Sequence, residues 1–347
     1  MKIHWATDYE GIGNAYGYSV HNSRTREALA SHGVTFDKDA TVAFHVAPAH
    51  RFRPVSGKFN VLYTAHEMHD LSQKYVDGLA NADVVLVTAG FLVDVVKKCL
   101  PDKPVHLCHL GVDVDTFAYR QRKFSVPFRF LWVGAPNARK GWEIVMHAWE
   151  AFRNAPECEL YIKTTVTKQM TGRGNVVFDS RNLSVAELVR LYHSAHCFLF
   201  PSFGEGFGLT MAEAMATGLP VIYTPWTAML DVNNAKCGYP LKYRVVTGRY
   251  YGVDTQLAQA DTGDMVRKML EVIRRYRRAA RKGQGAARRI RKHFTWDHTA
   301  RRILRILKNN VERTDLGETF MNKGSPPYPF PNTLPAMSHS LIASRKM

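Results

Sequence analysis

The sequence predicts an α/β protein of two doubly wound domains, each with a parallel β-sheet between layers of helices. Short apolar runs alternate with amphipathic helical stretches along most of the 347 residues. This alternation is typical of parallel sheets that are covered on both faces. The chain is also too long for one ordinary hydrophobic core and has the length expected of two domains.

The expected strands fall into two series. They lie at residues 2–7, 40–46, 59–65, 83–89 and 105–111 in the first series, and at 128–135, 159–165, 175–180, 196–202 and 220–225 in the second. Helical patterns occupy most of the gaps, at residues 23–33, 90–100, 141–155 and 184–195. A polar stretch at 118–128 predicts a linker between the two units.

These patterns predict the limits of the domains. We expect an N-terminal domain over residues 1–122 and a C-terminal domain over residues 123–296. The proline-rich residues 315–347 have no periodicity and predict an extended or disordered tail. Because ligands bind at the carboxyl ends of strands in doubly wound sheets, the site is expected in a cleft between the domains.

The stretch EGFGLTMAE, residues 205–213, places two glutamates around a glycine-rich step between a strand and a helix. Nearby prolines and glycines predict a loop at Glu205 and a helix that begins near Gly208 or Leu209, which leaves Glu213 about one turn inside the helix. Free backbone N–H groups at such a turn favour an anion. Flanking carboxylates favour hydroxyl groups, so a sugar linked through phosphates to a ribose suits the whole stretch.

The string PSFGEGFGLTMAEAMATGLPVI resembles the E-x7-E signature of the retaining glycosyltransferases of family 4, and weaker similarity extends over about residues 2–310. The resemblance implies the GT-B fold, in which two Rossmann-like domains face a central cleft and a helix, here about 297–313, crosses back to the first domain. It implies that Glu205 is a catalytic residue beside the donor sugar and that Glu213 binds the ribose of the nucleotide. The remaining donor-binding residues of this stretch would be Gly206, Phe207, Gly208 and Leu209.

A second donor-binding segment is VGAPNARKGWE, residues 133–143, between a strand and an amphipathic helix. Members of the resembled family read G-R-x-x-x-x-K-G here, with the arginine and lysine on the diphosphate. Gly134 and Lys140 match this pattern, and the resemblance implies that Lys140 is catalytic. The arginine position holds Ala135, so Arg139 is the candidate to supply the missing charge.

Two segments of the first domain complete the expected site. The glycines of DYEGIGNAYGYS, residues 8–19, differ in spacing from the dinucleotide fingerprint G-x-G-x-x-G. The resemblance implies that this loop approaches the donor phosphates and the acceptor. Its candidates are Gly13 and Asn14 for the donor, and Tyr16 and Tyr18 for the acceptor.

The segment YTAHEMHD, residues 63–70, ends an apolar strand. The resemblance places His66 where many family members carry a histidine that positions the donor sugar, and it makes His66 a catalytic candidate. Glu67 and His69 are candidates for binding the acceptor. No metal is expected, because no histidine pair combines helical spacing with a nearby third ligand.

The net charge of +17 is concentrated late in the chain. Residues 1–125 carry 14 Lys/Arg and 13 Asp/Glu, whereas residues 267–313 carry 17 Lys/Arg and three acids. This basic segment, 267–313, favours an anionic partner, although a solvated helix surface has the same composition. DNA is favoured over a membrane surface because the basic helices offer little bulky apolar surface.

Cysteine usage and hydropathy predict a cytoplasmic address. The five cysteines are widely spaced and form no CxxC pair, which favours free thiols in a reducing compartment. No apolar run approaches the roughly 20 residues that cross a bilayer, and the first residues lack the apolar stretch of a secretory signal.

Together these features predict a retaining, metal-independent glycosyltransferase that needs no cofactor beyond its nucleotide-sugar donor. A UDP-sugar is the expected donor and a GDP-sugar is the alternative. The acceptor could be a hydroxylated base in DNA, or a membrane glycolipid or polysaccharide, and a small-molecule or protein acceptor is also open. The competing class is a GT-B protein that transfers no sugar, either a sugar-nucleotide epimerase or a basic nucleic-acid-binding module.

Overall fold

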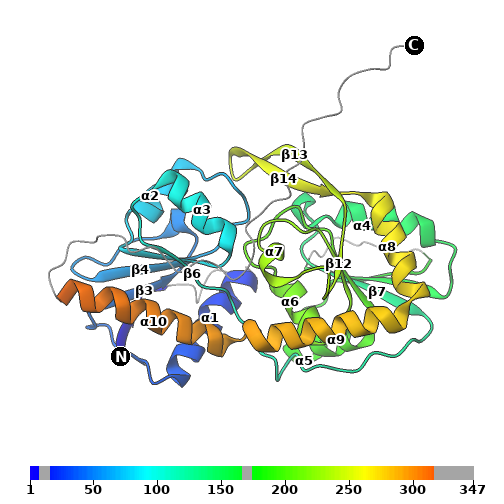
Figure 1. Cartoon of the computed structure of the whole chain (residues 1–347), viewed down its shortest axis with the longest axis horizontal. Helices are drawn as coiled ribbons and strands as arrows, with labels where there is room; N and C mark the ends of the chain where they lie inside the picture. Colours follow the sequence, from blue (N-terminus) through cyan, green and yellow to red (C-terminus); the bar gives the residue numbers. More distant parts are fainter. Residues whose placement is uncertain (8–15, 166–173, 316–347) are drawn as a thin grey trace, which may run out of the picture.

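The computed structural model describes residues 1–7, 16–165 and 174–315, with side chains described up to Asn310 and not at Tyr16. Within these ranges the chain forms two six-stranded sheets and a two-stranded hairpin (Figure 1). The two sheets lie in separate halves of the molecule, and the hairpin lies above the junction between them. The predicted tail and most of the segment 8–19 lie outside the described residues.

The N-terminal sheet has the strand order β2-β1-β3-β4-β5-β6, with every pairing parallel. Its strands are β1 (Lys2–Trp5), β2 (Thr35–Phe36), β3 (Val42–Val46), β4 (Phe59–Thr64), β5 (Val84–Val87) and β6 (Val105–Leu107). Its helices are α1 (Tyr16–Ser31), α2 (Gln73–Ala80) and α3 (Gly90–Cys99), with a short 3-10 helix η2 (Ala49–Arg51). Strands β3 and β5 are buried along their whole length, as parallel strands with helices on both faces should be.

Successive residues of β4 face different cores. Val61 and Tyr63 pack in the core that includes α1 and the last helix, α10 (Trp296–Asp315), whereas Leu62 packs in the core under α2 and α3. Helices α1 and α10 contact each other and lie along the same side of the sheet (Figure 1). Helix α10 is therefore part of the N-terminal half, although it follows the C-terminal sheet in the sequence.

The C-terminal sheet has the order β12-β11-β10-β7-β8-β9, again all parallel. Its strands are β7 (Phe128–Val133), β8 (Cys158–Lys163), β9 (Val176–Asp179), β10 (Cys197–Phe200), β11 (Val221–Tyr223) and β12 (Tyr239–Pro240). Its helical segments are η3 (Ala138–Lys140), α4 (Trp142–Trp149), η4 (Glu150–Phe152), α5 (Val185–Ser194), α6 (Leu209–Ala216), α7 (Met229–Val232), α8 (Thr262–Arg274) and α9 (Tyr276–His293).

This strand order creates a switch point between β7 and β10. From β7 the chain proceeds outward through β8 to β9, and from β10 it proceeds in the opposite direction through β11 to β12. The loops that follow β7 and β10 therefore diverge around a crevice, where doubly wound proteins bind their ligands. Both loops carry residues that the sequence predicts for the donor.

All ten expected strands are present, each of them shorter than predicted. The structure also contains elements that the sequence patterns do not predict: the two-residue strands β2 and β12, and the hairpin of β13 (Tyr243–Tyr250) and β14 (Val253–Ala260). The hairpin turns through Tyr251 and Gly252, which have φ angles of 50° and 82°. A two-residue turn with both φ angles positive matches the twist of an antiparallel pair.

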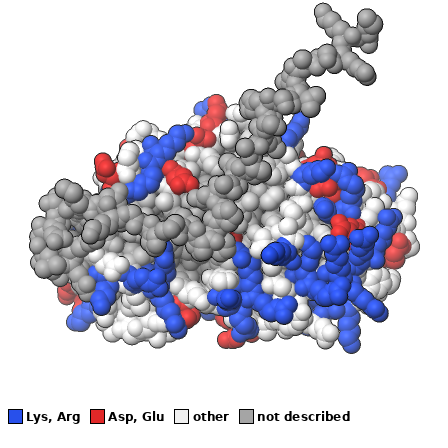
Figure 2. All heavy atoms as spheres, in the orientation of Figure 1, with Lys and Arg blue, Asp and Glu red and all other residues white. Residues whose placement is uncertain are grey.

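The basic segment forms parts of α8, α9 and α10. The buried residues of α9 form one stripe: Tyr276, Ala279, Gly283, Ala286, Ala287 and Ile290. Most of its arginines are exposed on the opposite face, whereas Arg289 is half-buried and donates to the carbonyls of Val232 and Asp231. Figure 2 shows lysines and arginines gathered over α8 and α9. None of the described helices is long and apolar enough to cross a membrane.

Candidate active site

The loops after β7 and β10 are locked together by backbone contacts. Phe203 N donates to Arg139 O at 2.8 Å, and Ser202 Oγ donates to the same oxygen at 3.1 Å. Gly141, with φ +67°, lies so close to the backbone of Pro201 that an added Cβ would be 2.0 Å from Pro201 O. Because any side chain here would collide with backbone, only glycine fits this close approach.

Glu205 lies in the second loop, as the glycines and prolines predict, and its carboxylate is almost fully buried. Its Oε1 accepts hydrogen bonds from Lys140 Nζ and Ser202 Oγ, both at 2.7 Å. Its Oε2 lies 3.1 Å from Arg139 Nη1. The structure therefore brings the predicted residues Arg139, Lys140 and Glu205 into one cluster at the switch point.

The cluster determines the charge of its members. Burial alone would raise the pKa of Glu205, but the charges of Lys140 and Arg139 outweigh burial and lower this pKa from 4.5 to about 2. Burial lowers the pKa of Lys140, against the opposing charge of Glu205. For Arg139, Glu205 and Glu67 outweigh burial and raise the pKa.

Arg139 also reaches the N-terminal half. Its Nη2 lies 3.4 Å from Glu67 Oε1, and its Nε donates to Tyr250 Oη at 2.9 Å. Its Nη1 donates to Gly204 O at 2.7 Å. One buried guanidinium thus links both halves of the molecule and the tip of the hairpin.

Glu213 is separate from this cluster. It lies inside α6, which begins at Leu209, and its Oε2 accepts a hydrogen bond from Tyr192 Oη at 3.0 Å. The helix is capped by Gly208 with φ 85° and by no side-chain hydrogen bond. Gly208 therefore offers no side chain to cap the first backbone N–H groups of α6, and the helix dipole favours an anion there.

The N-terminal half meets the glycine-rich loop through the segment after β4. An added Cβ on Gly204 would lie 2.6 Å from Glu67 O, and one on Gly206 would lie 3.1 Å from His66 O. His66 is buried, with Nε2 3.3 Å from Asp70 O. Burial lowers the pKa of His66 against the charge of Glu67, so the imidazole is neutral at pH 7.

The other predicted residues lie around this centre. Gly134 follows β7, and its N–H donates to Lys163 O at 3.0 Å. The His69 ring packs 4.9 Å from Trp226, and Tyr18 Oη donates to Ala65 O at 2.8 Å. Gly13 and Asn14 lie outside the described residues, as does the side chain of Tyr16.

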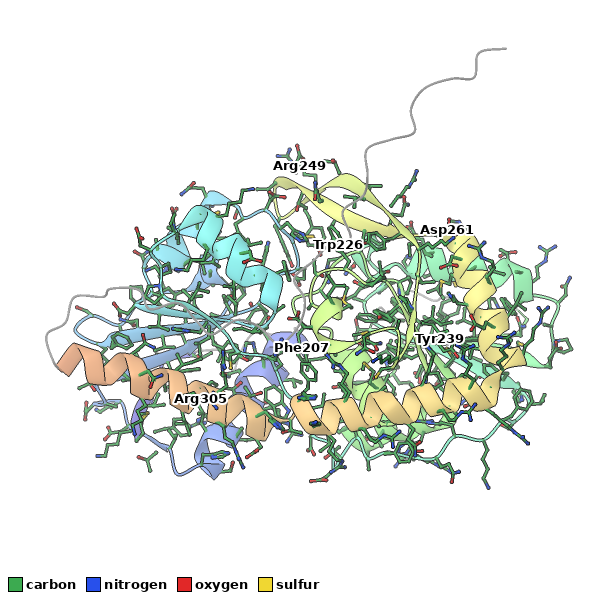
Figure 3. All side chains as sticks on the ribbon, in the orientation of Figure 1. Phe207, Trp226, Tyr239, Arg249, Asp261 and Arg305 are labelled. Atoms are coloured by element: carbon green, nitrogen blue, oxygen red, sulfur yellow. The ribbon has the colours of Figure 1, made fainter. Side chains whose placement is uncertain are left out.

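Further polar contacts hold the two halves together. Thr88 Oγ1 donates to Gly206 O at 2.6 Å. Asp231 Oδ2 accepts from Gly90 N at 2.6 Å and lies 3.0 Å from His109 Nε2. Figure 3 shows Phe207 and Trp226 between the two sheets.

Sequence reasoning missed several residues that support the cluster. They are Ser202, Tyr250 and Thr227, whose hydroxyl accepts a hydrogen bond from Glu205 N at 2.9 Å. Thr227 also has a φ of 48°, which is unusual for a β-branched residue. These partners come from distant positions and have no motif. The local signal in the hairpin that carries Tyr250 is weak, because Gly252 suits a two-residue turn but Tyr251 is not a residue that such turns favour.

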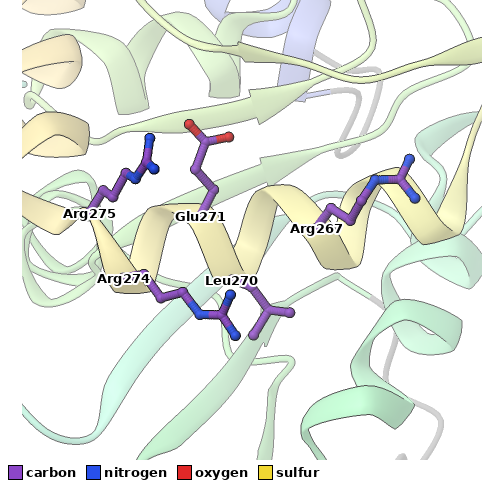
Figure 4. A pocket seen from close by; sticks show the side chains of 5 residues that line it. All are labelled: Arg267, Leu270, Glu271, Arg274 and Arg275. Atoms are coloured by element: carbon purple, nitrogen blue, oxygen red, sulfur yellow. The ribbon is translucent and has the colours of Figure 1, made fainter.

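Open pockets lie elsewhere, on the basic helices. One of ≈ 410 Å³ is lined by Arg267, Leu270, Glu271, Arg274 and Arg275 on α8 (Figure 4). A second of ≈ 330 Å³ lies beside α9 and includes Arg277 and Arg281. Among the described residues no group of three or more His, Cys, Asp or Glu side chains could hold a metal ion.

Comparison with solved structures identifies the architecture. The chain superposes on sucrose-phosphate synthase from Thermosynechococcus elongatus with a TM-score of 0.62 and 15% identity, covering 85% of this chain and 79% of that one. An Anabaena protein in complex with UDP and glucose gives a TM-score of 0.58 at 11% identity, covering 82% and 81%. The chain has the GT-B fold.

Sequence comparisons agree with this fold. Residues 127–263, within the C-terminal half, match the family described as glycosyl transferases group 1. The chain is 26% identical over 220 residues to MMP alpha-(1->4)-mannosyltransferase of Mycolicibacterium hassiacum, covering 60% of this chain and 49% of that protein. It is 24% identical over 260 residues to mannosylfructose-phosphate synthase of Agrobacterium fabrum, covering 67% and 54%. The chain spans about half the length of these relatives.

Proposed function

We propose that this protein is a retaining glycosyltransferase that moves a sugar from a nucleotide-sugar to a carbohydrate acceptor. The observation that carries the proposal is the buried cluster of Glu205, Lys140 and Arg139 at the switch point of the C-terminal sheet. Charged side chains are buried together at a cost in desolvation, which is characteristic of functional sites. The match of residues 127–263 to glycosyl transferases group 1 supports the same activity.

In this proposal the cluster serves the donor. The diphosphate binds at the uncapped N-terminus of α6, and Lys140 and Arg139 turn from Glu205 toward it. Glu205 and neutral His66 then bind hydroxyl groups of the sugar, and Glu213 binds the ribose. We propose a UDP-sugar as the donor, with a GDP-sugar as the alternative.

The reaction breaks the bond between the anomeric carbon and the diphosphate oxygen. The acceptor hydroxyl oxygen bonds to the anomeric carbon from the same face, and its proton passes to the departing phosphate oxygen. The cations and helix amides stabilise the growing negative charge, so we propose that no metal is needed. Closure of the two halves excludes water and limits donor hydrolysis.

The proposed acceptor is a carbohydrate because the two relatives above are named as a mannosyltransferase and a mannosylfructose-phosphate synthase. DNA with hydroxylated bases and a membrane glycolipid remain alternatives, favoured only by the basic segment. A non-transferring epimerase or a nucleic-acid-binding module is the competing class.

The test incubates the protein with radiolabelled UDP- and GDP-sugars, in buffer with and without EDTA. We expect slow donor hydrolysis in water and transfer to sugar acceptors, both unaffected by EDTA. Neither hydrolysis nor transfer with any donor, together with tight and salt-sensitive DNA binding, would overturn the proposal.

Glu213→Ala tests the ribose contact separately. We expect UDP or GDP to bind at least about tenfold more weakly, because a buried carboxylate that binds hydroxyls contributes on the order of 1.5–3 kcal/mol. Calorimetry measures the affinity, and Tyr192→Phe controls for loss of the local hydrogen bond. An unchanged affinity in Glu213→Ala would show that the ribose lies elsewhere.

A further inference from the structure

The hairpin of β13 and β14 extends from the C-terminal half to the N-terminal half. Figure 1 shows it above the junction of the two halves. Thr255 Oγ1 donates to Asp70 Oδ2 at 2.9 Å, and Tyr250 Oη accepts from Arg139 Nε. The Tyr251 ring lies 5.6 Å from the His66 ring and 4.4 Å from the Tyr250 ring. The tip of the hairpin is therefore part of the wall of the candidate active site.

Tyr251 is unusual in both conformation and exposure. Its φ of 50° lies in the left-handed region, where glycine or asparagine fits with less strain than tyrosine. Its side chain is large and apolar, yet the residue is 56% exposed. A strained bulky residue at the edge of an active site indicates that its side chain has a function of its own.

We propose that Tyr251 binds the acceptor and that its exposed ring stacks on a neutral pyranose ring. The inference rests on the proposed function and names the acceptor chemistry of the same site. The C–H groups on one face of a pyranose are weakly positive and fit the negative face of an aromatic ring. Glu67, on the same side of the site and about one-fifth exposed, is available to accept hydrogen bonds from sugar hydroxyls.

The charges around the tip favour a neutral ring over a nucleic acid. Glu67 and Asp70 approach the tip from the N-terminal half, and Asp254 lies 3.7 Å from Arg249 on the hairpin itself. Glu67 and Asp254 are each paired with an arginine, so the tip lacks the excess of positive charge that binds a phosphate backbone. The strongly basic face lies on α8 and α9, away from this tip.

The test uses two variants that separate the ring from the turn. Tyr251→Asn removes the ring and leaves a residue that tolerates the left-handed turn, whereas Tyr251→Phe keeps the ring. Val245→Ala, at an exposed position of β13, is the control for changes to the hairpin. Methyl α-mannopyranoside is the pyranose probe, glycerol the ring-free probe and a hydroxymethylcytosine oligonucleotide the nucleic-acid probe, each with UDP present.

Binding is measured by saturation-transfer NMR and the KM of the probe by radiolabel transfer. We expect Tyr251→Asn to weaken the binding of methyl α-mannopyranoside about five- to tenfold. Tyr251→Phe and Val245→Ala should bind it nearly as well as wild type. Donor hydrolysis and UDP affinity should stay within about twofold in Val245→Ala, and in Tyr251→Asn both should fall by less than mannoside binding does. The binding of glycerol should be the same with and without the Tyr251 ring.

Three outcomes would overturn the inference while leaving the proposed function intact. In the first, wild-type protein transfers sugar but does not bind the mannoside. In the second, Tyr251→Asn binds the mannoside as well as wild type does, and in the third only the oligonucleotide binds in a way that depends on the ring. A fall in donor hydrolysis or UDP affinity equal to the fall in mannoside binding would assign Tyr251 to the donor and overturn it too. Wild-type protein with no donor hydrolysis or transfer would overturn both proposals.

Discussion

Two regions of the molecule hold their charges in different ways. In the loops after β7 and β10, Glu205 and Arg139 are each less than a tenth exposed and lie within hydrogen-bonding distance of each other. Along α8 and α9, many arginines stand in solvent on the face opposite the buried stripe. Arg267, for example, pairs with Asp264 while its own side chain is 61% exposed.

The difference shows why charge density is a poor guide to the site. Water screens an exposed pair, whose net contribution to stability is on the order of 0–1 kcal/mol. A buried cluster has lost that water, so each member depends on its partners and breaking one contact is costly. The few charges of the loops should therefore matter more than the many charges of the helices.

Removing one charge from the loops should have the largest effect. Glu205→Gln leaves Lys140 without its paired carboxylate and Arg139 with only the more distant Glu67. We therefore expect the free energy of unfolding to fall by about 3–5 kcal/mol and sugar transfer to be lost. Urea unfolding followed by circular dichroism measures the first effect.

The matched control is Glu67→Gln, whose carboxylate is more exposed and lies 3.4 Å from the guanidinium. We expect it to lose less than half as much stability. Equal losses in the two variants would mean that burial does not set the strength of these contacts.

The same carboxylate should give the stability a pH dependence. Folding lowers the pKa of Glu205 from 4.5 to about 2, so its contribution is complete above pH 4.5 and is lost as the pH falls through this window. The difference in unfolding free energy between wild type and Glu205→Gln should shrink by up to about 1.4 kcal/mol per pH unit there. Urea titrations at several pH values measure it.

Glu150→Gln replaces an exposed carboxylate and is the control for the substitution itself. Its difference from wild type should be nearly constant through the window. A Glu205→Gln difference that is also constant would show that the native carboxylate is not held in its charged form.

The parts of this comparison that the sequence predicts are local. Glycines and prolines around Glu205 predict the loop, and hydrophobic periodicity predicts the strands on either side. Arg139 and Lys140 directly precede Gly141, the glycine that the close approach to Pro201 requires. These signals act within a few residues, so the pattern of the chain contains them.

The partners of the cluster are not local. Tyr250 lies 111 positions from Arg139, and Thr227 lies 22 positions from Glu205. Their contacts depend on how the hairpin and the loop after β11 lie against the sheet, which no spacing in the sequence encodes. The exposed hairpin was missed because its mixed polar sequence lacks the continuous apolar runs of the sheet strands.

Two glycines of α9 should separate packing from exposure within the basic region. An added Cβ on Gly285 meets only Cys237 Sγ at 3.8 Å, whereas one on Gly283 would lie 2.2 Å from Gly218 O. We expect Gly285→Ala to stabilise the protein by about 0.5–1 kcal/mol through helix propensity, and Gly283→Ala to destabilise it by about 1–3 kcal/mol. Thermal and urea unfolding of both variants checks the signs. If both variants changed the free energy of unfolding in the same direction, the close packing of α9 on the backbone at Gly218 would be contradicted.

The smallest effect on stability is expected from the arginines of α9. Arg277→Gln combined with Arg281→Gln should change the free energy of unfolding by no more than about 0.5 kcal/mol, because both residues are exposed. If the basic face binds polyanions, the slope of log affinity for duplex DNA against log salt should fall by about 2. Lys38→Gln with Lys74→Gln removes the same charge from the N-terminal half and should leave that slope unchanged. Equal slopes of log affinity against log salt in the two double variants would mean that the basic face is a solvated helix surface. A large fall in the free energy of unfolding would mean that its arginines, like Arg139, are bound within the fold.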